Sequence, residues 1–159
     1  MDNSQALTLY IVLSRAYHAI AEADKAQIRT YGLSPSEFSA LELLYHKGPR
    51  PIQQIAAKVL LSSGSMTYVV SQLEKKGLVT RSPCEKDKRV FYAALTEDGA
   101  TLIRKIFPAH EAFLRGLLDT LTSEENENLT RYLRRLGMAA AEKAANGEKK
   151  KKRNTAKGA

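Results

Sequence analysis

Residues 60–79 read LLSSGSMTYVVSQLEKKGLV, and this stretch decides the fold. Ser62 can cap the start of a helix, and Gly77 can end it. Between them, apolar side chains recur at the spacing of one helical face, namely Met66, Val69, Val70 and Leu73. The opposite face is rich in hydroxyl groups and small side chains. The stretch therefore predicts an amphipathic helix that packs on one side and presents a polar surface on the other.

Two more helices are predicted just upstream. The segment Ser34-Pro35-Ser36-Glu37 combines a capping serine, a proline at the first helical position and the glutamate of a capping box. This helix should end at Gly48, and Pro51 opens the next, shorter helix. Three helices joined by short connections follow the order of a helix-turn-helix core.

After Gly77 the apolar pattern changes from a helical period to alternation. Residues 78–81 and 90–95 predict two strands, and the charged segment 82–89 predicts the loop of a hairpin between them. A hairpin directly after the third helix of such a core is a wing. Residues 75–89 carry a net charge of +4, and a basic patch at this place favours a nucleic-acid partner.

Further helices are predicted on both sides of the core. Residues 6–30 carry apolar side chains mostly at helical spacing. Thr96-Glu97-Asp98 starts a long helix in which Pro108 should cause a kink or an interruption. Thr122-Ser123-Glu124-Glu125 is a second capping box and opens the last helix. The apolar stripes of these outer helices need a partner, and a two-fold dimer would supply one.

Composition and charge restrict the class of protein. The chain has 159 residues, of which 43% are hydrophobic, so it can bury a core. Its net charge is +8, but residues 146–159 hold +5 of this and lack large apolar side chains, so we expect them to form a disordered tail. No apolar run approaches the roughly 18 residues of a membrane span. Residues 1–20 do not read as a signal peptide, so a cytoplasmic protein without a membrane partner is expected.

Few side chains in the sequence could form a disulfide, bind a metal or take part in catalysis. Cys84 is the single cysteine, which excludes an internal disulfide, and with three scattered histidines it gives no metal-site spacing. The sequence shows no nucleophile elbow, phosphate-binding loop or carboxylate constellation. We therefore expect neither an enzyme nor a bound cofactor.

The order of helix, wing and following helix resembles the MarR family of bacterial transcription regulators. The resemblance is carried by residues 60–70, then by Leu73-Glu74-Lys75-Lys76-Gly77-Leu78-Val79 with Arg81, by Asp87-Lys88-Arg89, and by Leu95-Thr96-Glu97-Asp98-Gly99. It covers residues 6–145 and implies a mainly α fold with a small β-hairpin wing.

The organisation that this resemblance implies is one MarR-like domain followed by the tail. We expect that domain to span residues 1–145, with the winged helix-turn-helix core at 34–96 and dimerisation helices at 6–30 and 97–145. The disordered basic tail would occupy residues 146–159.

The resemblance also implies a homodimer that binds double-stranded DNA at a pseudo-palindromic operator, usually as a repressor. The recognition helix would enter the major groove. The side chains expected to face the DNA are Ser62, Ser63, Gly64, Ser65, Thr67, Tyr68, Ser71 and Gln72. The wing would add Lys86, Lys88 and Arg89, with Asp87 bracing the loop or orienting Arg89, since an acid pointing at phosphate would repel it.

The resemblance to one branch of the family also implies an effector. Residues 41–49 and Pro83-Cys84 resemble the branch of the family that senses quinones and catechols, which implies release from DNA by a small phenolic or quinone-like compound or by thiol modification. The candidate pocket residues are Tyr10, Tyr17, His18, Phe38 and Tyr45. The alternative is that these aromatic side chains are ordinary core residues.

Cys84 is the candidate redox sensor. The nearby cations Lys86, Lys88 and Arg89 would stabilise its thiolate, whereas the neighbouring acids Glu85 and Asp87 oppose this.

Two other functions remain open at this stage. An architectural DNA-binding protein would bind with little sequence preference and without an effector. A winged helix used as a protein-interaction module would tolerate neutralisation of its wing.

Overall fold

The computed structural model describes residues 2–155 of the chain, and for side chains residues 2–147. It divides into two compact units, Met1–Leu117 and Leu118–Ala159, which are described separately below. None of the helices within residues 2–155 combines the length and the apolar character needed to cross a membrane.

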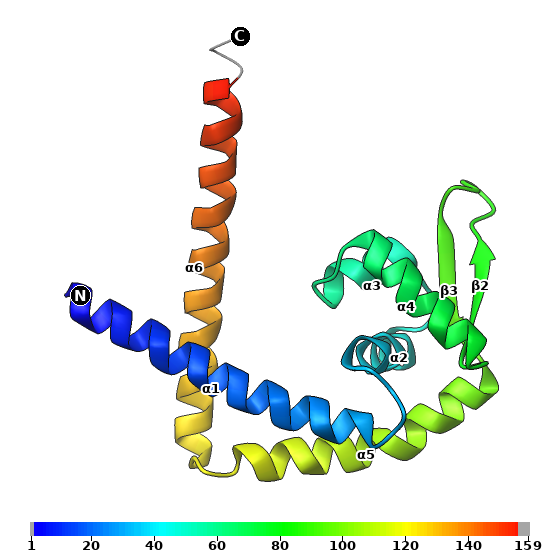
Figure 1. Cartoon of the computed structure of the whole chain (residues 1–159), viewed down its shortest axis with the longest axis horizontal. Helices are drawn as coiled ribbons and strands as arrows, with labels where there is room; N and C mark the ends of the chain where they lie inside the picture. Colours follow the sequence, from blue (N-terminus) through cyan, green and yellow to red (C-terminus); the bar gives the residue numbers. More distant parts are fainter. Residues whose placement is uncertain (1, 156–159) are drawn as a thin grey trace. The chain divides into compact units, whose positions relative to one another are not determined.

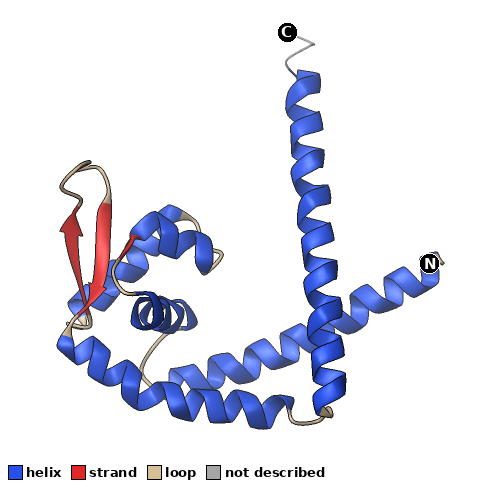
Figure 2. Ribbon diagram, turned by 180° about the vertical axis from the view of Figure 1, so that it is seen from behind, coloured by secondary structure: helices blue, strands red, loops and turns tan. Residues whose placement is uncertain are grey.

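The first unit consists of helices with one small sheet at its edge, as Figures 1 and 2 show. In chain order its elements are α1 (Asn3–Arg29), α2 (Pro35–Lys47), β1 (Arg50–Pro51), α3 (Ile52–Lys58), α4 (Ser63–Lys75), β2 (Val79–Pro83), β3 (Phe91–Leu95) and α5 (Glu97–Leu118). The predicted fold class, mainly α with a small β wing, is confirmed.

The ends of the core helices follow from their capping residues. The Ser34 hydroxyl accepts the Glu37 N–H at 3.2 Å, while the Glu37 carboxylate accepts the Ser34 N–H at 2.8 Å, so the predicted capping box is confirmed. The Ser62 hydroxyl accepts the Ser65 N–H at 3.1 Å and starts α4 as predicted. Gly77 follows the end of α4 with a φ of 72°, a backbone conformation that favours glycine.

The sheet has three antiparallel strands in the order β1-β3-β2. Strands β2 and β3 form the predicted hairpin, with Val79 paired to Leu95 and Pro83 to Phe91. The hairpin extends further than predicted because Ser82 and Pro83 pair with β3 rather than lying in the loop. The two-residue strand β1 was not predicted, since a segment this short leaves no alternation to detect.

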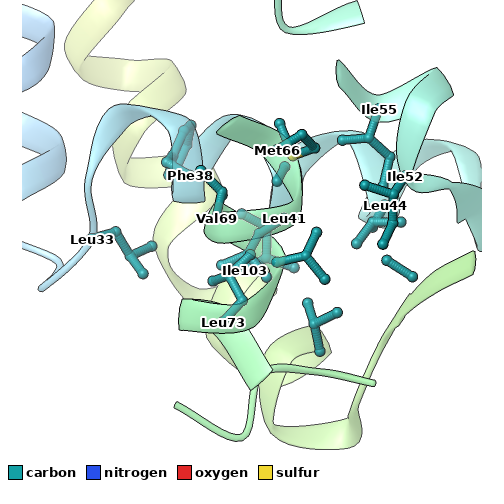
Figure 3. Close-up of a cluster of buried hydrophobic side chains, with 14 of the residues drawn as sticks. Leu33, Phe38, Leu41, Leu44, Ile52, Ile55, Met66, Val69, Leu73 and Ile103 are labelled. Carbon is teal, nitrogen blue, oxygen red and sulfur yellow. The ribbon is translucent and has the colours of Figure 1, made fainter. Parts of the chain in front are cut away.

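The core of the first unit lies between the helix-turn-helix and α5. Phe38 and Leu41 of α2, Ile55 of α3, Met66 of α4 and Ile103 of α5 are all at most 2% exposed, and Figure 3 shows them gathered in one cluster. Each such side chain contributes roughly 1.5–3 kcal/mol by leaving water. Because α4 shares this core with α2, α3 and α5, its outer face is carried on a rigid support.

The start of α5 packs very closely on the turn between α4 and β2. The Thr96 hydroxyl donates to the Gly77 carbonyl at 2.7 Å and accepts the Gly99 N–H at 3.0 Å. A Cβ atom at position 99 would lie 2.0 Å from the Leu78 carbonyl oxygen, so only glycine permits this approach. Of the kink or interruption expected at Pro108, the interruption is absent: α5 is continuous through this residue, and Figure 1 shows the helix changing direction along its length.

The second unit consists mainly of α6 (Ser123–Thr155). Thr122 and Glu125 form the predicted capping box, with the Thr122 N–H donating to the Glu125 carboxylate at 2.8 Å. The sequence predicts a disordered tail from residue 146, but α6 continues to Thr155, because extending an existing helix with lysines and arginines needs no new nucleation. Residues 156–159 of the predicted tail lie outside the described residues.

Candidate nucleic-acid interface

The outer face of α4 is exposed as the sequence predicts. Met66, Val69, Val70 and Leu73 turn inward and are at most 8% exposed, whereas the Tyr68 side chain is 67% exposed. Of the residues expected to face DNA, Ser71 and Gln72 are half-buried and the others are exposed: Ser62, Ser63, Gly64, Ser65, Thr67 and Tyr68. The polar face is continuous along the first two turns of the helix.

Several hydroxyl groups on this face also stabilise the helix itself. The Ser62 and Ser65 hydroxyl oxygens lie 2.8 Å apart, and the Thr67 hydroxyl donates to the Ser63 carbonyl at 2.9 Å. Gly64 has no atom within 4 Å of the position that a Cβ would take, so its small size is not needed for packing inside the chain. Tyr68 is therefore the main side chain on this face that is free to contact a partner.

The wing holds a two-pronged contact between Asp87 and Arg89. The Arg89 Nε donates to Asp87 Oδ1 at 3.1 Å and its Nη2 donates to Oδ2 at 3.2 Å, while the Arg89 backbone N–H also reaches Oδ1 at 3.1 Å. The Arg89 side chain is 91% exposed. The guanidinium side chain and then the backbone N–H of Arg89 hold the pKa of Asp87 below its usual range. Asp87 is thus hydrogen-bonded to both the side chain and the backbone of Arg89, a contact compatible with either role expected for it, bracing the loop or orienting Arg89.

The wing loop is closed by backbone hydrogen bonds. The Cys84 N–H donates to the Val90 carbonyl at 2.8 Å, and the Val90 N–H donates to the Asp87 carbonyl at 2.9 Å. Lys86 and Lys88 are exposed on this loop, and Cys84 is half-buried at its base. The loop thus presents its cations on a defined backbone.

The base of the wing is joined to α4 by contacts that were not singled out in the sequence. Arg81 Nη2 lies 3.0 Å from Glu74 Oε2, and the guanidinium carbon lies 5.9 Å from the centre of the Phe91 ring. The sequence marked Arg81 as a charge in a basic patch and as part of the family resemblance, but not as a partner of Glu74, because spacing along the chain does not reveal a pair between a helix and a strand. This pair couples the position of the wing to that of α4.

The structure does not gather the five candidate effector residues into one site. Phe38 is 2% exposed and packs in the core against His110, with ring centres 4.4 Å apart. Tyr45 neighbours His46 instead, with ring centres 5.1 Å apart. Tyr10, Tyr17 and His18 are exposed on α1, and within the described residues no aromatic ring contact joins them to Phe38 or Tyr45.

A groove between α2 and α3 has a mixed lining that the sequence did not reveal. Its volume is about 550 Å³, and it is lined by Ser39, Glu42, Leu43, His46, Lys47, Lys58 and Val59. A neighbouring cavity of about 440 Å³ shares Leu43, Lys47 and Lys58 and adds Arg50. Apolar surface therefore lies beside several cations at this place.

The structure also brings a buried histidine of α5 next to a half-buried aspartate of α1. His110 is 6% exposed, and its Nε2 lies 3.6 Å from Asp24 Oδ1, too far for a hydrogen bond. Within the described residues, His110 Nδ1 and Asp24 Oδ1 have no hydrogen-bond partner. This pair was not predicted, because both residues lie within otherwise ordinary helical patterns.

Comparison with known proteins assigns the family. The family model described as MarR family matches residues 33–91. The chain is 48% identical over 136 residues to the HTH-type transcriptional regulator MhqR of Bacillus subtilis (strain 168), covering 86% of this chain and 94% of MhqR.

Solved structures agree on the fold. AbsC, a MarR family transcriptional regulator from Streptomyces coelicolor, matches with a TM-score of 0.78 and 22% identity over 88% of this chain and 96% of its own. Sco3205, a MarR family regulator from the same organism solved in complex with DNA, matches with a TM-score of 0.80 and 22% identity over 86% of this chain and 88% of its own. With a relative nearly half identical over most of both chains, this chain belongs to the MarR family, whose members are transcriptional regulators.

Proposed function

We propose that this protein is a homodimeric repressor that binds a pseudo-palindromic operator with α4 in the major groove and the wing on the adjoining backbone and minor groove. The observation that carries the proposal is the exposed polar face of α4 beside a wing whose exposed Arg89 is hydrogen-bonded to Asp87. The MarR family regulator Sco3205, which has the same fold, was solved in complex with DNA.

Helix α4 has suitable dimensions and chemistry for reading bases. Its 13 residues span roughly 20 Å, and a major groove about 12 Å wide admits a helix. We assign base contacts to Tyr68 and Gln72, since the hydroxyls of Ser62, Ser65 and Thr67 are already engaged within the helix. Tyr68 offers apolar contact to a thymine methyl group, and Gln72 can pair with adenine.

The wing supplies the second contact through charge. Asp87 occupies the Nε and Nη2 groups of Arg89, and the other guanidinium donors remain available to a phosphate or a minor-groove base edge. Lys86 and Lys88 are exposed beside it and would neutralise phosphates. Operator affinity should therefore fall steeply with salt.

The dimer would cover apolar side chains that are exposed in the single chain. On α1 these are Leu7, Leu9, Tyr10, Ile11, Val12, Tyr17 and Ile20. On α6, considered by itself, they are Leu129, Tyr132, Leu133, Leu136 and Met138. Large exposed apolar faces on a monomer mark interaction surfaces, and a two-fold axis lets the same surface serve both copies.

We place the effector site in the groove between α2 and α3 rather than among the five aromatic residues predicted. The groove is of a size that accommodates small ligands, and its lining sets Leu43 and Val59 beside Lys47 and Lys58. The apolar side chains suit the face of a flat phenolic or quinone-like compound, and the polar groups of the lining, which include Glu42 as well as the two lysines, can hydrogen-bond its oxygen atoms. Binding there would release DNA only if it favours a dimer geometry with misplaced recognition helices.

The experiment that tests this function is selection of bound sequences from a random DNA library. An enriched palindrome with half-site centres about 10 base pairs apart, bound by a dimer in light scattering, is the expected result. Binding that enriches no motif and vanishes at moderate salt would instead support the architectural alternative. The selected complex is then challenged with catechol, methylhydroquinone and peroxide, using the wild type, Lys58→Ala and Cys84→Ser.

The two variants separate the two routes of release. If the groove binds the effector, Lys58→Ala weakens the response to phenols and Cys84→Ser does not. If thiol modification releases the protein, Cys84→Ser alone abolishes the response. We assign the protein no catalytic activity and expect it in the cytoplasm, where the DNA lies.

A further inference from the structure

One lysine joins three separate parts of the first unit. Lys76 directly follows α4, and its Nζ lies 2.8 Å from Glu37 Oε1 and 3.1 Å from the Gly32 carbonyl oxygen. Glu37 lies in the first turn of α2, and Gly32 lies in the turn between α1 and α2. The ammonium group therefore links the end of the recognition helix to the place where α1 passes into the core.

The carboxylate of this pair is buried and depends on the lysine. The Glu37 side chain is 8% exposed, whereas the Lys76 side chain is 40% exposed. Burial by itself raises the pKa of Glu37, but the hydrogen bonds from Lys76 and Ser34 outweigh it and hold that pKa below its usual range. A buried charged carboxylate is tolerated only with such partners, so loss of Lys76 leaves an uncompensated charge.

The charge of Lys76 is thus engaged inside the protein. The sequence groups Lys76 with Lys86 and Lys88 in one basic patch, but among the described residues those two wing lysines have no ion-pair partner. Lys75, next to Lys76, is likewise exposed and makes no described ion pair. Lysines that are close in sequence therefore have different roles in the structure.

We propose that the Lys76–Glu37 pair is a positioning device for DNA binding: it fixes the end of α4 to the turn after α1, and so sets the distance between the two half-sites that the dimer accepts. The inference rests on the proposed DNA-binding function. Lys76 acts through Glu37 and Gly32 and makes no contact with DNA. Because α1 carries the exposed apolar face assigned to the dimer, a change at this joint moves α4 relative to the two-fold axis.

The test compares Glu37→Gln and Lys76→Gln with two matched lysine variants, Lys75→Gln and Lys88→Gln. Affinity is measured at several salt concentrations on the selected operator and on versions with the half-site spacing changed by about one base pair in either direction. Glu37→Gln retains an acceptor for the Ser34 N–H, so the capping box survives. Dimer content and folding of each variant are checked by light scattering and circular dichroism.

The proposal predicts a shared effect of the two pair variants. Each should lower affinity for the preferred spacing by about fivefold or more and reduce the preference between spacings. The salt dependence should stay unchanged, and the double variant should be no weaker than the single ones. The slope of the logarithm of the binding constant against the logarithm of the salt concentration (the salt slope) should instead fall in magnitude by about one in Lys88→Gln, while the spacing preference is kept.

Several outcomes would overturn it. A salt slope reduced by about one in Lys76→Gln, with affinity retained in Glu37→Gln, would make Lys76 a phosphate contact. Unchanged spacing preference in both pair variants would equally reject the proposal. If wild-type protein selects no operator at all, the proposed function fails instead, and that result is read before any variant is compared.

A second readout needs no DNA and applies if Lys76→Gln does not fold. Hydrogen exchange of free Glu37→Gln should accelerate at the Gly32 turn and around Lys76, while the wing amides at 84–90 keep their wild-type rates. Lys76→Arg keeps the charge and should preserve the spacing preference. Altered spacing in Lys76→Arg, or unchanged exchange in Glu37→Gln, would contradict the positioning role.

Discussion

Arg89 donates to both carboxylate oxygens of Asp87, through Nε at 3.1 Å and Nη2 at 3.2 Å. An acid next to a DNA-binding cation is expected to repel phosphate, so its presence in the wing requires a compensating role. The geometry provides one, since the carboxylate holds an otherwise free guanidinium in a single direction. Orientation and charge therefore have opposite effects on DNA affinity, which makes the role of Asp87 testable by the sign of the change.

Replacing Asp87 with alanine should weaken operator binding although it removes a negative charge. Without its partner, the exposed Arg89 side chain loses its fixed direction, and ordering it on DNA costs rotamer entropy. The control is Glu85→Ala, which removes an exposed acid from the same loop and should strengthen binding slightly. Titration by fluorescence anisotropy measures both variants, and equal strengthening in both would mean that Asp87 has no orienting role.

Gly99→Ala should destabilise the fold. Its Cβ would meet the Leu78 carbonyl oxygen at 2.0 Å, and because the obstructing atom belongs to the backbone, the start of α5 would have to move. The expected loss is about 1–3 kcal/mol of unfolding free energy, as for other overpacked sites. Urea denaturation at fixed protein concentration measures it.

Gly116→Ala is the matched control in the same helix. A Cβ at that position meets nothing within 4 Å, so the variant should gain up to about 1 kcal/mol from higher helix propensity. The idea of a required close approach at Gly99 is refuted if the two variants have the same stability.

Much of the fold was predictable because its signals are local. Ser34 and Glu37 lie within one turn of each other, and Ser62 lies one residue before the helix it caps, so pattern and chemistry coincide. The inward face of α4 was predictable for the same reason, since Met66 and Leu73 belong to one helical period.

The features that were missed depend on contacts between distant segments. Lys76 and Glu37 belong to different helices, and no local pattern shows that they meet. His110 falls inside a helix whose apolar stripe looks complete without it. Strand β1 forms because it pairs with β3, and β2 extends to Pro83 because Pro83 pairs with Phe91 of β3. Tertiary pairing, rather than propensity, decides these positions.

The stability of the protein should carry an acid-dependent contribution from Glu37. Its pKa is below the usual value of 4.5, so the ionised form is favoured by folding. The stabilisation is fully present above about pH 4.5 and is lost as the pH falls through the lower folded pKa. Glu37→Gln should therefore be less stable than the wild type at neutral pH by about 1–3 kcal/mol, and the two should converge in acid.

Urea denaturation between neutral pH and about pH 3 measures this difference. Lys76→Gln should show the same convergence, because protonation removes the unpaired charge that makes it unstable. A gap between wild type and Glu37→Gln that stays constant across the acid range would contradict the assignment.

Tyr68→Ala should separate recognition from stability. The side chain is 67% exposed on the outer face of α4 and is not part of the core, so its removal should change the unfolding free energy by no more than about 0.5 kcal/mol. If Tyr68 contacts a thymine methyl group, the variant should lose about 1–3 kcal/mol of discrimination at one position in each half-site and keep its preference at the others.

Tyr17→Ala is the control, because Tyr17 is 72% exposed on α1, where we place dimer contacts. That variant should raise the dimer dissociation constant while leaving base preference intact. Affinities for operators carrying every single-base substitution measure both effects, and a uniform loss at all positions in Tyr68→Ala would reassign the tyrosine from base reading to backbone contact.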